Sequence, residues 1–193
     1  MKKFEIKFNN EVIANVSQKG EDFDLSYVSE VVTESDVNRI YKRIGKEMDL
    51  KEINVDTLTL NKSVKEVSPR AFSNKKIRKV IIDGSGLKTI GAFAFAHCDI
   101  EEIKYNYKFD SNGYIKDGVT NIYKGAFSNN KLTEVFLPNT LLVIEDKAFA
   151  NNNLTRTAVY ENNLDLIQKR LSIFWGNEEN KFFNAAILAK KNS

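Results

Sequence analysis

VTNIYKGAFSN, residues 119–129, decides the fold, because its pattern occurs four times in this chain of 193 residues. In each copy an aliphatic residue is followed three positions later by Ile or Val, then by an Ala-Phe pair, and by Asn or His two positions after the Phe. The copies are Val64-Val67-Ala71-Phe72-Asn74, Leu87-Ile90-Ala94-Phe95-His97, Val119-Ile122-Ala126-Phe127-Asn129 and Leu141-Ile144-Ala148-Phe149-Asn151. A pattern that recurs along one chain predicts that each copy forms the same structural unit.

A second apolar pattern follows each copy and completes the repeat. Leu132 comes five residues after Phe127, and Val135 and Leu137 follow three and five residues further on. Successive Phe residues of the four copies lie 23, 32 and 22 positions apart, so the second interval indicates that the middle copy carries about ten extra residues. A period in the twenties predicts a solenoid, in which each unit buries its apolar face by stacking on its neighbours.

These repeats resemble the BspA-type leucine-rich repeats in their spacing, in the Ala-Phe pair and in the Leu-Pro of VFLPN, residues 135–139. The resemblance covers about 100 residues. It implies an arc-shaped solenoid with short parallel strands on its concave face. It also implies a role like that of the family's members, which are commonly bacterial or protist surface proteins that adhere to host or matrix proteins.

The Phe residues of the four copies are expected to line up inside the stack as a ladder of rings, each of which buries roughly 150–250 Å². The Ala before each ring is small and lets neighbouring coils approach. The Asn two positions after it is expected to bond the turn backbone of the adjacent coil, since buried turn amides need partners.

We expect an α+β fold with three parts: an N-terminal cap over residues 1–50, repeats over 51–160, and a C-terminal helical cap over 161–193. Alternating apolar residues on both sides of Asn9-Asn10 predict a β-hairpin, and the capping side chains of residues 33–36 predict a helix over about 36–48. The cap is therefore β-β-α. In the C-terminal part we expect a helix from Asn163 to about Gly176 and a second from about 178 to 190.

Composition indicates a soluble, folded chain: 42% of its residues are hydrophobic and 28% are charged. The net charge of +3 is too small to imply a polyanionic partner. The single cysteine excludes an internal disulfide. We find no signal peptide and no run long enough to span a membrane, and therefore expect a cytoplasmic protein. The cell surface is the alternative if a leader has been trimmed.

The search for chemistry gives no active site. His97 is the sole histidine and takes the place of Asn in the other copies, so it is interpreted as a structural substitute. Cys98 beside it lacks the partners for a zinc set or an activated thiolate. We therefore expect no enzyme, no metal and no cofactor.

Two groups of residues are candidates for binding a protein partner. If strands line the concave face, the side chains that lie between the inward-facing apolar residues of each strand point outward. Large apolar side chains at these outward positions have no core to pack into and are candidates for binding a partner. The extra residues at about 105–117 are expected to form a hairpin with an aromatic tip; whether the hairpin binds or shields the coil is left open. The candidates are Ile81, Lys104, Phe136, Arg156 and Tyr160 on the strands, and Tyr107, Phe109 and Tyr114 on the hairpin.

The function hypothesis is a non-catalytic module that binds a protein through the concave face and the hairpin. The alternatives are an intracellular inhibitor or regulator of a specific enzyme, encoded by a phage or mobile element, and a bacterial surface adhesin. A third hypothesis makes residues 1–50 a catalytic or nucleic-acid-binding domain that uses Lys42, Arg43 and Lys46. We do not expect nucleic acid as the partner, and we interpret the basic run at residues 75–79 as a solvated turn, with a phosphate-binding patch as the alternative.

Overall fold

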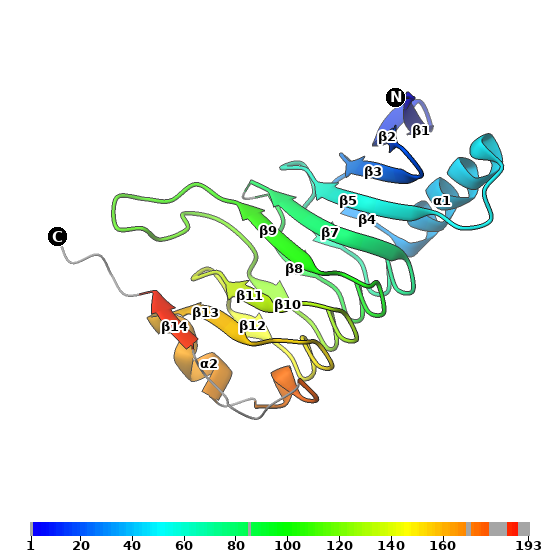
Figure 1. The fold of residues 1–193 in the computed structure, drawn as a ribbon. Coiled ribbons are helices and arrows are strands. Elements are labelled where there is room, and N and C mark those ends of the chain that lie inside the picture. The colour runs from blue at the N-terminus through cyan, green and yellow to red at the C-terminus, as the bar shows by residue number, and fades with distance from the viewer. Residues whose placement is uncertain (1, 85, 169–170, 178–184, 189–193) are drawn as a thin grey trace.

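The computed structural model describes residues 2–84, 86–168, 171–177 and 185–188. Over these residues the structure is mixed α/β, with few helices and three strand-rich sheets. Figure 1 shows the longer strands lying side by side from the N-terminal end of the molecule to the C-terminal end. This mixed, strand-rich architecture agrees with the fold class that the sequence predicts at that coarse level.

The largest sheet has six strands in the order β1-β2-β3-β5-β7-β9. They are β1 Lys3–Phe8, β2 Glu11–Lys19, β3 Asp22–Tyr27, β5 Asn54–Leu60, β7 Lys76–Asp83 and β9 Glu102–Asn106. The pairs β1–β2 and β2–β3 are antiparallel, and from β3 onward every neighbour is parallel. Each parallel strand from β5 to β9 comes from a successive copy of the second apolar pattern.

Two smaller sheets complete the framework. One has the order β12-β10-β8-β6-β4 and consists of two-residue parallel strands, and the other is parallel with the order β11-β13-β14. Their strands are β4 Val31–Val32, β6 Glu66–Val67, β8 Thr89–Ile90, β10 Asn121–Ile122, β12 Val143–Ile144, β11 Glu134–Leu137, β13 Arg156–Tyr160 and β14 Ala185–Leu188. β6, β8, β10 and β12 contain the aliphatic residue that precedes each Ala-Phe pair.

The predicted Phe ladder is confirmed. Phe72, Phe95, Phe127 and Phe149 are fully buried, and successive ring centroids lie 5.0, 5.1 and 5.3 Å apart with planes within 6° of parallel. The adjacent backbone is hydrogen-bonded from coil to coil, because the amide of Phe127 donates to the carbonyl of Ala148 over 2.7 Å. Ring stacking and backbone bonding therefore hold neighbouring repeats in one register.

The asparagine prediction is corrected. Asn129, two positions after its Phe, has a left-handed backbone with φ of 56°, and its side-chain Oδ1 accepts from the side-chain Nδ2 of Asn151. The buried backbone is instead bonded by the next residue, Asn130. The Oδ1 of Asn130 accepts from the backbone amides of Cys98 and Ile100, while its Nδ2 donates to carbonyl oxygens of two coils. Asn152 repeats this arrangement in the following coil.

The expected N-terminal hairpin and helix are both present. β1 and β2 are joined at Asn9-Asn10, whose φ angles of 48° and 67° suit the two central positions of a tight hairpin turn. α1 spans Glu34–Met48, and the hydroxyl of Thr33 accepts from the amide of Asp36 at its N-terminus. Among the described residues, no helix has the length and apolar character needed to cross a bilayer.

Two strands within residues 1–50 were not expected from the sequence. β3 pairs in parallel with β5, and β4 pairs in parallel with β6, so residues 22–32 lie in line with the repeats that follow. The alternating side chains Phe23, Leu25 and Tyr27 are buried. Tyr27 packs edge-on against Phe72 with ring centroids 5.3 Å apart, so it ends the ladder without an Ala-Phe pair.

The C-terminal helices differ from the prediction. In place of one helix from Asn163 to about 176 the structure has three short helical segments: η1 Glu161–Asn163, α2 Leu164–Gln168 and η2 Leu171–Phe174. The second predicted helix is wrong at residues 185–188, which form β14 and pair in parallel with β13. The remainder of that predicted helix lies outside the described residues. The edge of β13 offers hydrogen-bond partners that outweigh a weak local preference for helix.

The hydrogen-bonding pattern of the repeats also continues beyond residue 160. Phe174 stacks on Phe149 with centroids 6.1 Å apart, and the amide of Phe149 donates to the carbonyl of Ile173 over 2.9 Å. Asn177, three residues after Phe174, bonds the coil before it as Asn130 and Asn152 do. Residues 171–177 therefore contribute a further ring to the ladder, where the sequence analysis ended the repeats at about 160.

Candidate functional site

The row of long parallel strands is interrupted between β9 and β11. β9 is the last strand of the six-stranded sheet, and β11 is the first strand of the three-stranded one. The coils still touch just before these strands, where the amide of Lys131 donates to the carbonyl of Ile100 over 2.8 Å. Beyond that bond the chain leaves β9 for the long insertion, which Figure 1 shows as the loop extending past the end of β9.

A groove of about 450 Å³ lies at this interruption, which we call the sheet-break groove. Its residues come from the start and body of β9, from the insertion and from β11. They are Glu101, Glu102, Ile103, Lys104, Tyr105, Tyr107, Phe109, Thr133, Glu134 and Phe136. A smaller hollow of about 180 Å³ adjoins it and shares Ile103, Glu134 and Phe136, so the depression continues toward β13.

Aromatic rings join the walls of the sheet-break groove. Tyr105 of β9 packs on Tyr107 of the insertion, at 5.1 Å between centroids, and on Phe136 of β11, at 5.7 Å. Phe136 packs in turn on Tyr160 of β13 at 5.8 Å, and Tyr160 stacks on Tyr114 of the insertion at 5.4 Å. The five rings form one connected cluster, which fastens both ends of the insertion to the strands.

Hydrogen bonds also hold the insertion against the strands. The Tyr160 hydroxyl donates to the carbonyl of Gly113 over 2.9 Å, and the Tyr107 hydroxyl accepts from the amide of Val119 over 3.3 Å. The side chain of Asn139 bonds both the amide and the carbonyl of Ile115. Burial raises the pKa of Tyr107 and of Tyr160 above the usual range, so both phenols are neutral at physiological pH.

Phe109 is the exposed apolar group of the insertion. The turn after it is held by Asp110, whose carboxylate accepts from the amides of Asn112 and Tyr114 over 2.8 and 2.9 Å. Phe109 forms an isolated antiparallel bridge with Ile115, and 58% of its surface is exposed. Its ring is thus presented at the groove by a backbone that is bonded on both sides.

Carboxylates surround the groove. Glu101 lies 4.0 Å from the Arg78 guanidinium, and Glu134 lies 3.7 Å from that of Arg156. In both pairs every side chain is at least half exposed, so water screens the attraction and each pair contributes little to stability. These carboxylates can therefore turn to a cationic partner at small cost.

The structure places the predicted strand residues on β7, β9, β11 and β13, but in two different sheets. Ile81 and Lys104 are register partners on β7 and β9, while Phe136 lies across the groove on β11. Arg156 is exposed on β13, in register with Glu134. The four residues follow one another on the strands β7, β9, β11 and β13, as expected from the order of the repeats. The interruption of the sheet lies between Lys104 and Phe136.

The sequence left open whether the aromatic hairpin binds a partner or shields the strands, and the structure covers most of the rings concerned. Tyr107 is only 8% exposed and Tyr160 only 5%, because both pack inside the aromatic cluster. Tyr114 is half-buried against Tyr160, which leaves Phe109 as the ring available to a partner. The hairpin therefore shields the strands with most of its rings and exposes one of them.

Sequence reasoning missed Tyr105 and Glu101 as lining residues of the groove. Tyr105 occupies an inward apolar position of the repeat, and Glu101 appeared as a scattered charge. The available signal was the aromatic residue at a position that is aliphatic in the neighbouring copies, Ile82 and Leu137. An aromatic ring there, directly before the insertion, marks the place where the regular packing ends.

The residues considered for catalysis lie apart from the groove. His97 is exposed on a left-handed turn with φ of 57°. Cys98 is buried, its thiol donates to the carbonyl of Phe72, and burial raises its pKa to about 12. Within the described part of the chain, no group of three or more His, Cys, Asp or Glu side chains is placed to hold a metal ion.

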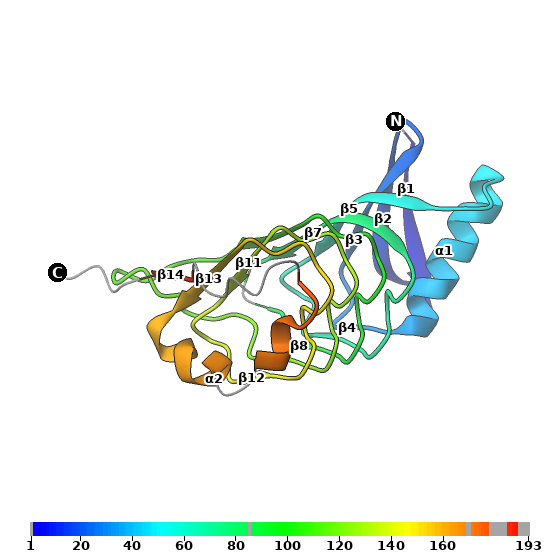
Figure 2. The same cartoon turned by 60° about the horizontal axis from the view of Figure 1, so that its bottom comes forward.

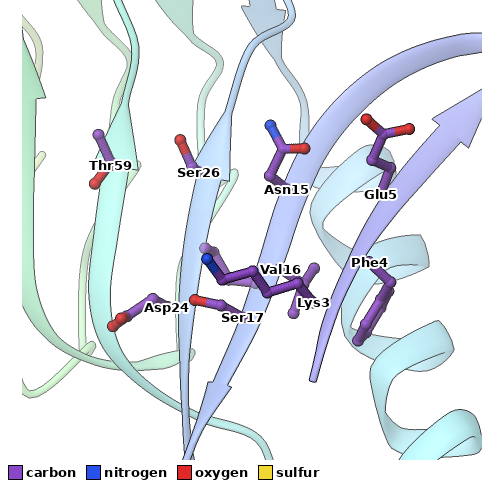
Figure 3. A pocket seen from close by; sticks show the side chains of 10 residues that line it. Lys3, Phe4, Glu5, Asn15, Val16, Ser17, Asp24, Ser26 and Thr59 are labelled. Carbon is purple, nitrogen blue, oxygen red and sulfur yellow. The ribbon is translucent and has the colours of Figure 1, made fainter. Parts of the chain in front are cut away.

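A second hollow of about 430 Å³ lies on the N-terminal strands (Figure 3). Small polar side chains from β2, β3 and β5 line it, with Phe4 and Glu5 of β1 on one side and the Lys3 side chain extending across toward β3. One oxygen of Asp24 is buried here without a hydrogen-bond partner among the described residues. The hollow extends the polar outer surface of the sheet, and its short side chains offer few of the aromatic or Arg anchors that typify protein-binding hot spots.

Comparison with known proteins adds one finding. A sequence model of the BspA type leucine rich repeat region matches residues 21–114 and 42–177, with six copies of the repeat. The match begins at residue 21, directly before β3, which is the first strand to pair in parallel with a repeat strand. It ends at Asn177, the last described asparagine that bonds the coil before it. Neither the curated proteins nor the solved structures gave a match.

Proposed function

Because the chain belongs to the family of BspA-type leucine-rich repeat proteins, we propose that it is a non-catalytic module that binds a protein at the sheet-break groove. The family is generally non-catalytic and suggests a protein-interaction or adhesin-like role. In this proposal the stacked repeats form a short solenoid that serves as a rigid support. The N-terminal hairpin with α1 covers one end, and the segment after β13 covers the other.

One observation carries the proposal: the repeat is interrupted at a single place among its described strands, and that place has an aromatic interior and an exposed ring. Phe109 is 58% exposed and lines the groove together with Tyr105 and Phe136. Binding hot spots combine aromatic anchors with a surround that excludes water. A ring already held by bonded backbone also loses little conformational entropy on binding.

The chemistry of the groove indicates the kind of partner segment that it accepts. Glu101, Glu102 and Glu134 surround an aromatic floor, with Lys104 as the cation among the lining residues. A segment with an apolar or aromatic side chain between basic residues would insert its apolar group against Phe136 and pair its charges with the carboxylates. Such pairing raises the rate of encounter and selects against acidic partners.

The test compares two exposed apolar residues. Phe109→Ala removes the ring at the groove, and Leu142→Ala removes a side chain that is 70% exposed elsewhere. Each variant and the unaltered protein are used as bait in lysate of the native host, with quantitative mass spectrometry of the bound proteins. We expect a stoichiometric partner that Leu142→Ala retains and that Phe109→Ala loses at least about tenfold, or about 1.4 kcal/mol of binding free energy.

A charge-reversal variant provides an independent test of the same site. Glu134→Lys changes the sign of a carboxylate at the groove without touching the aromatic cluster, and we expect it to weaken the same partner. A partner that Phe109→Ala and Glu134→Lys both retain in full would show that binding occurs elsewhere. The proposal would then be abandoned in favour of another surface, such as the exposed Trp175 beside Lys147.

A further inference from the structure

A second groove, of about 460 Å³, lies beside the C-terminal end of α1 and shares no lining residue with the sheet-break groove. Three separate segments meet there: the last turns of α1, the loop that leads to β5, and the turn that leads to β7. Its lining residues are Tyr41, Lys42, Gly45, Lys46, Leu50, Lys51, Glu52, Ile53, Asn74, Lys75 and Lys76. We call it the lysine groove. Figures 1 and 2 show α1 at the N-terminal end of the molecule.

Positive charge is concentrated in the lysine groove. Its lining contains five lysines and one glutamate, a net charge of +4, whereas the net charge of the whole chain is only +3. Glu52 pairs with Lys76 over 2.7 Å. No carboxylate of the described residues lies within ion-pairing distance of Lys42, Lys46, Lys51 or Lys75, so the groove holds most of its charge uncompensated.

Local structure accounts for only part of this cluster. Lys46 lies in the last turn of α1, where a cation is favourable because the helix dipole is negative at that end. Lys75 lies over the ring of Tyr41, 5.2 Å from its centroid. Lys51 and Lys76 have no such role in the helix, and they come from other segments of the chain. Like charges gathered in one depression repel one another and reduce the stability of the unliganded protein.

We propose that the lysine groove binds a small ligand that carries two or more phosphate groups. A phosphate monoester has a charge of about −1.5 to −2 at neutral pH, so two of them would match the net charge of the groove. Lysine ammonium groups bind phosphate oxygens as mobile point charges, and four of these five side chains are exposed and able to converge. The volume lies in the range of roughly 300–1,000 Å³ of small-molecule sites.

Nucleic acid fits the surroundings less well. Binding of a long polyanion needs a basic surface that extends along the strand, and aromatic side chains on which its bases can stack. Tyr41 is only 9% exposed and its ring is covered by Lys75. The exposed carboxylates of Glu47 and Asp49 flank the end of α1 just outside the groove. The charge is therefore confined to a small hollow.

The test uses inorganic tripolyphosphate as the probe, in isothermal titration calorimetry at low salt. The variant Lys46→Gln/Lys51→Gln removes two charges from the groove. The control Lys108→Gln/Lys116→Gln removes two exposed charges from the insertion, so the net charge of the two proteins is equal. Thermal unfolding without ligand shows that each variant is folded, and we expect the groove variant to melt at the same temperature as the unaltered protein or slightly above it.

We expect one tripolyphosphate per chain, bound equally by the unaltered protein and the control, and at least about tenfold more weakly by the groove variant. Orthophosphate and sulfate should bind far more weakly than the probe. Equal weakening in the control, or unchanged binding by the groove variant, would overturn the assignment. A single-stranded oligonucleotide that binds more tightly than tripolyphosphate would replace the small ligand with nucleic acid and overturn it too.

Discussion

The ladder and the sheet-break groove are built from the same kinds of residue, yet they differ in what their aromatic rings do. Phe95 and Phe127 stack with centroids 5.1 Å apart inside a fully bonded backbone. Between these same two residues the chain carries about ten extra residues. On the strand side of the repeat, Tyr105 of β9 and Phe136 of β11 meet edge-on with centroids 5.7 Å apart, and β9 and β11 do not pair with each other. Where the repeats are regularly spaced, the rings stack and stabilise the fold. Where the insertion interrupts the repeats, aromatic rings line an accessible groove.

The largest effect is expected in the ladder. Phe127→Ala should lower the free energy of unfolding by about 3–5 kcal/mol, because it removes a fully buried ring that stacks on both neighbours and leaves a cavity. Urea unfolding followed by circular dichroism measures this change. Phe109→Ala is the matched comparison. A loss below about 1 kcal/mol for Phe127→Ala would mean that the ladder does not hold the repeats together.

Next in size is the asparagine that bonds neighbouring coils. Asn152→Ala leaves the amide of Leu132 and the carbonyls of Phe127 and Phe149 without their side-chain partner, and we expect a loss of about 2–3 kcal/mol. The adjacent Asn151→Ala should cost about 1 kcal/mol or less, since Asn151 is exposed and its side chain donates a single exposed bond, to the Asn129 side chain. Thermal melts of the two variants give the order, and equal losses would contradict it.

These two asparagines show how far the sequence could be interpreted. The period of the Ala-Phe pairs predicted the ladder, because buried rings at a fixed spacing have few other arrangements. The adjacent Asn positions are indistinguishable as residue types, and only the backbone angle decides which side chain turns inward. The strand β14 was likewise predicted as helix, because Ala185–Leu188 suits a helix locally and pairs with β13 only in the folded chain.

The candidate site was predictable in part for the same reason. The outward row that contains Ile81, Lys104 and Phe136 follows from alternation along each strand. The separation of β9 from β11 does not, since it depends on how the insertion packs. The cytoplasmic location and the alternative roles as an enzyme inhibitor or a surface adhesin stay predictions.

A smaller effect is expected where the insertion is fastened. Tyr160→Phe removes the hydrogen bond to the carbonyl of Gly113 but keeps the ring in the cluster, so we expect a loss of about 1 kcal/mol. Hydrogen exchange of residues 107–118 should become faster. Tyr123→Phe, which removes a hydroxyl outside the cluster, serves as the control. Unchanged exchange in Tyr160→Phe would show that the insertion is held by other contacts.

The smallest effect on stability is expected at the exposed ring. Phe109→Ala should change the free energy of unfolding by no more than about 0.5 kcal/mol, because the ring is mostly in water already. Its effect should appear in partner binding alone. A loss of stability near that of Phe127→Ala would place Phe109 in the core and would remove it as a binding residue.

The most direct measurement of the central claim removes the interruption itself. Deleting residues 107–116 leaves four positions from Tyr105 to Val119, the same spacing as from Leu137 to Leu141 in the next copy. We expect this variant to unfold cooperatively, with a melting temperature equal to or above that of the unaltered protein, and to lose the partner that the unaltered protein captures. A folded deletion variant that still binds the partner at full strength would contradict the assignment of the sheet-break groove as the binding site.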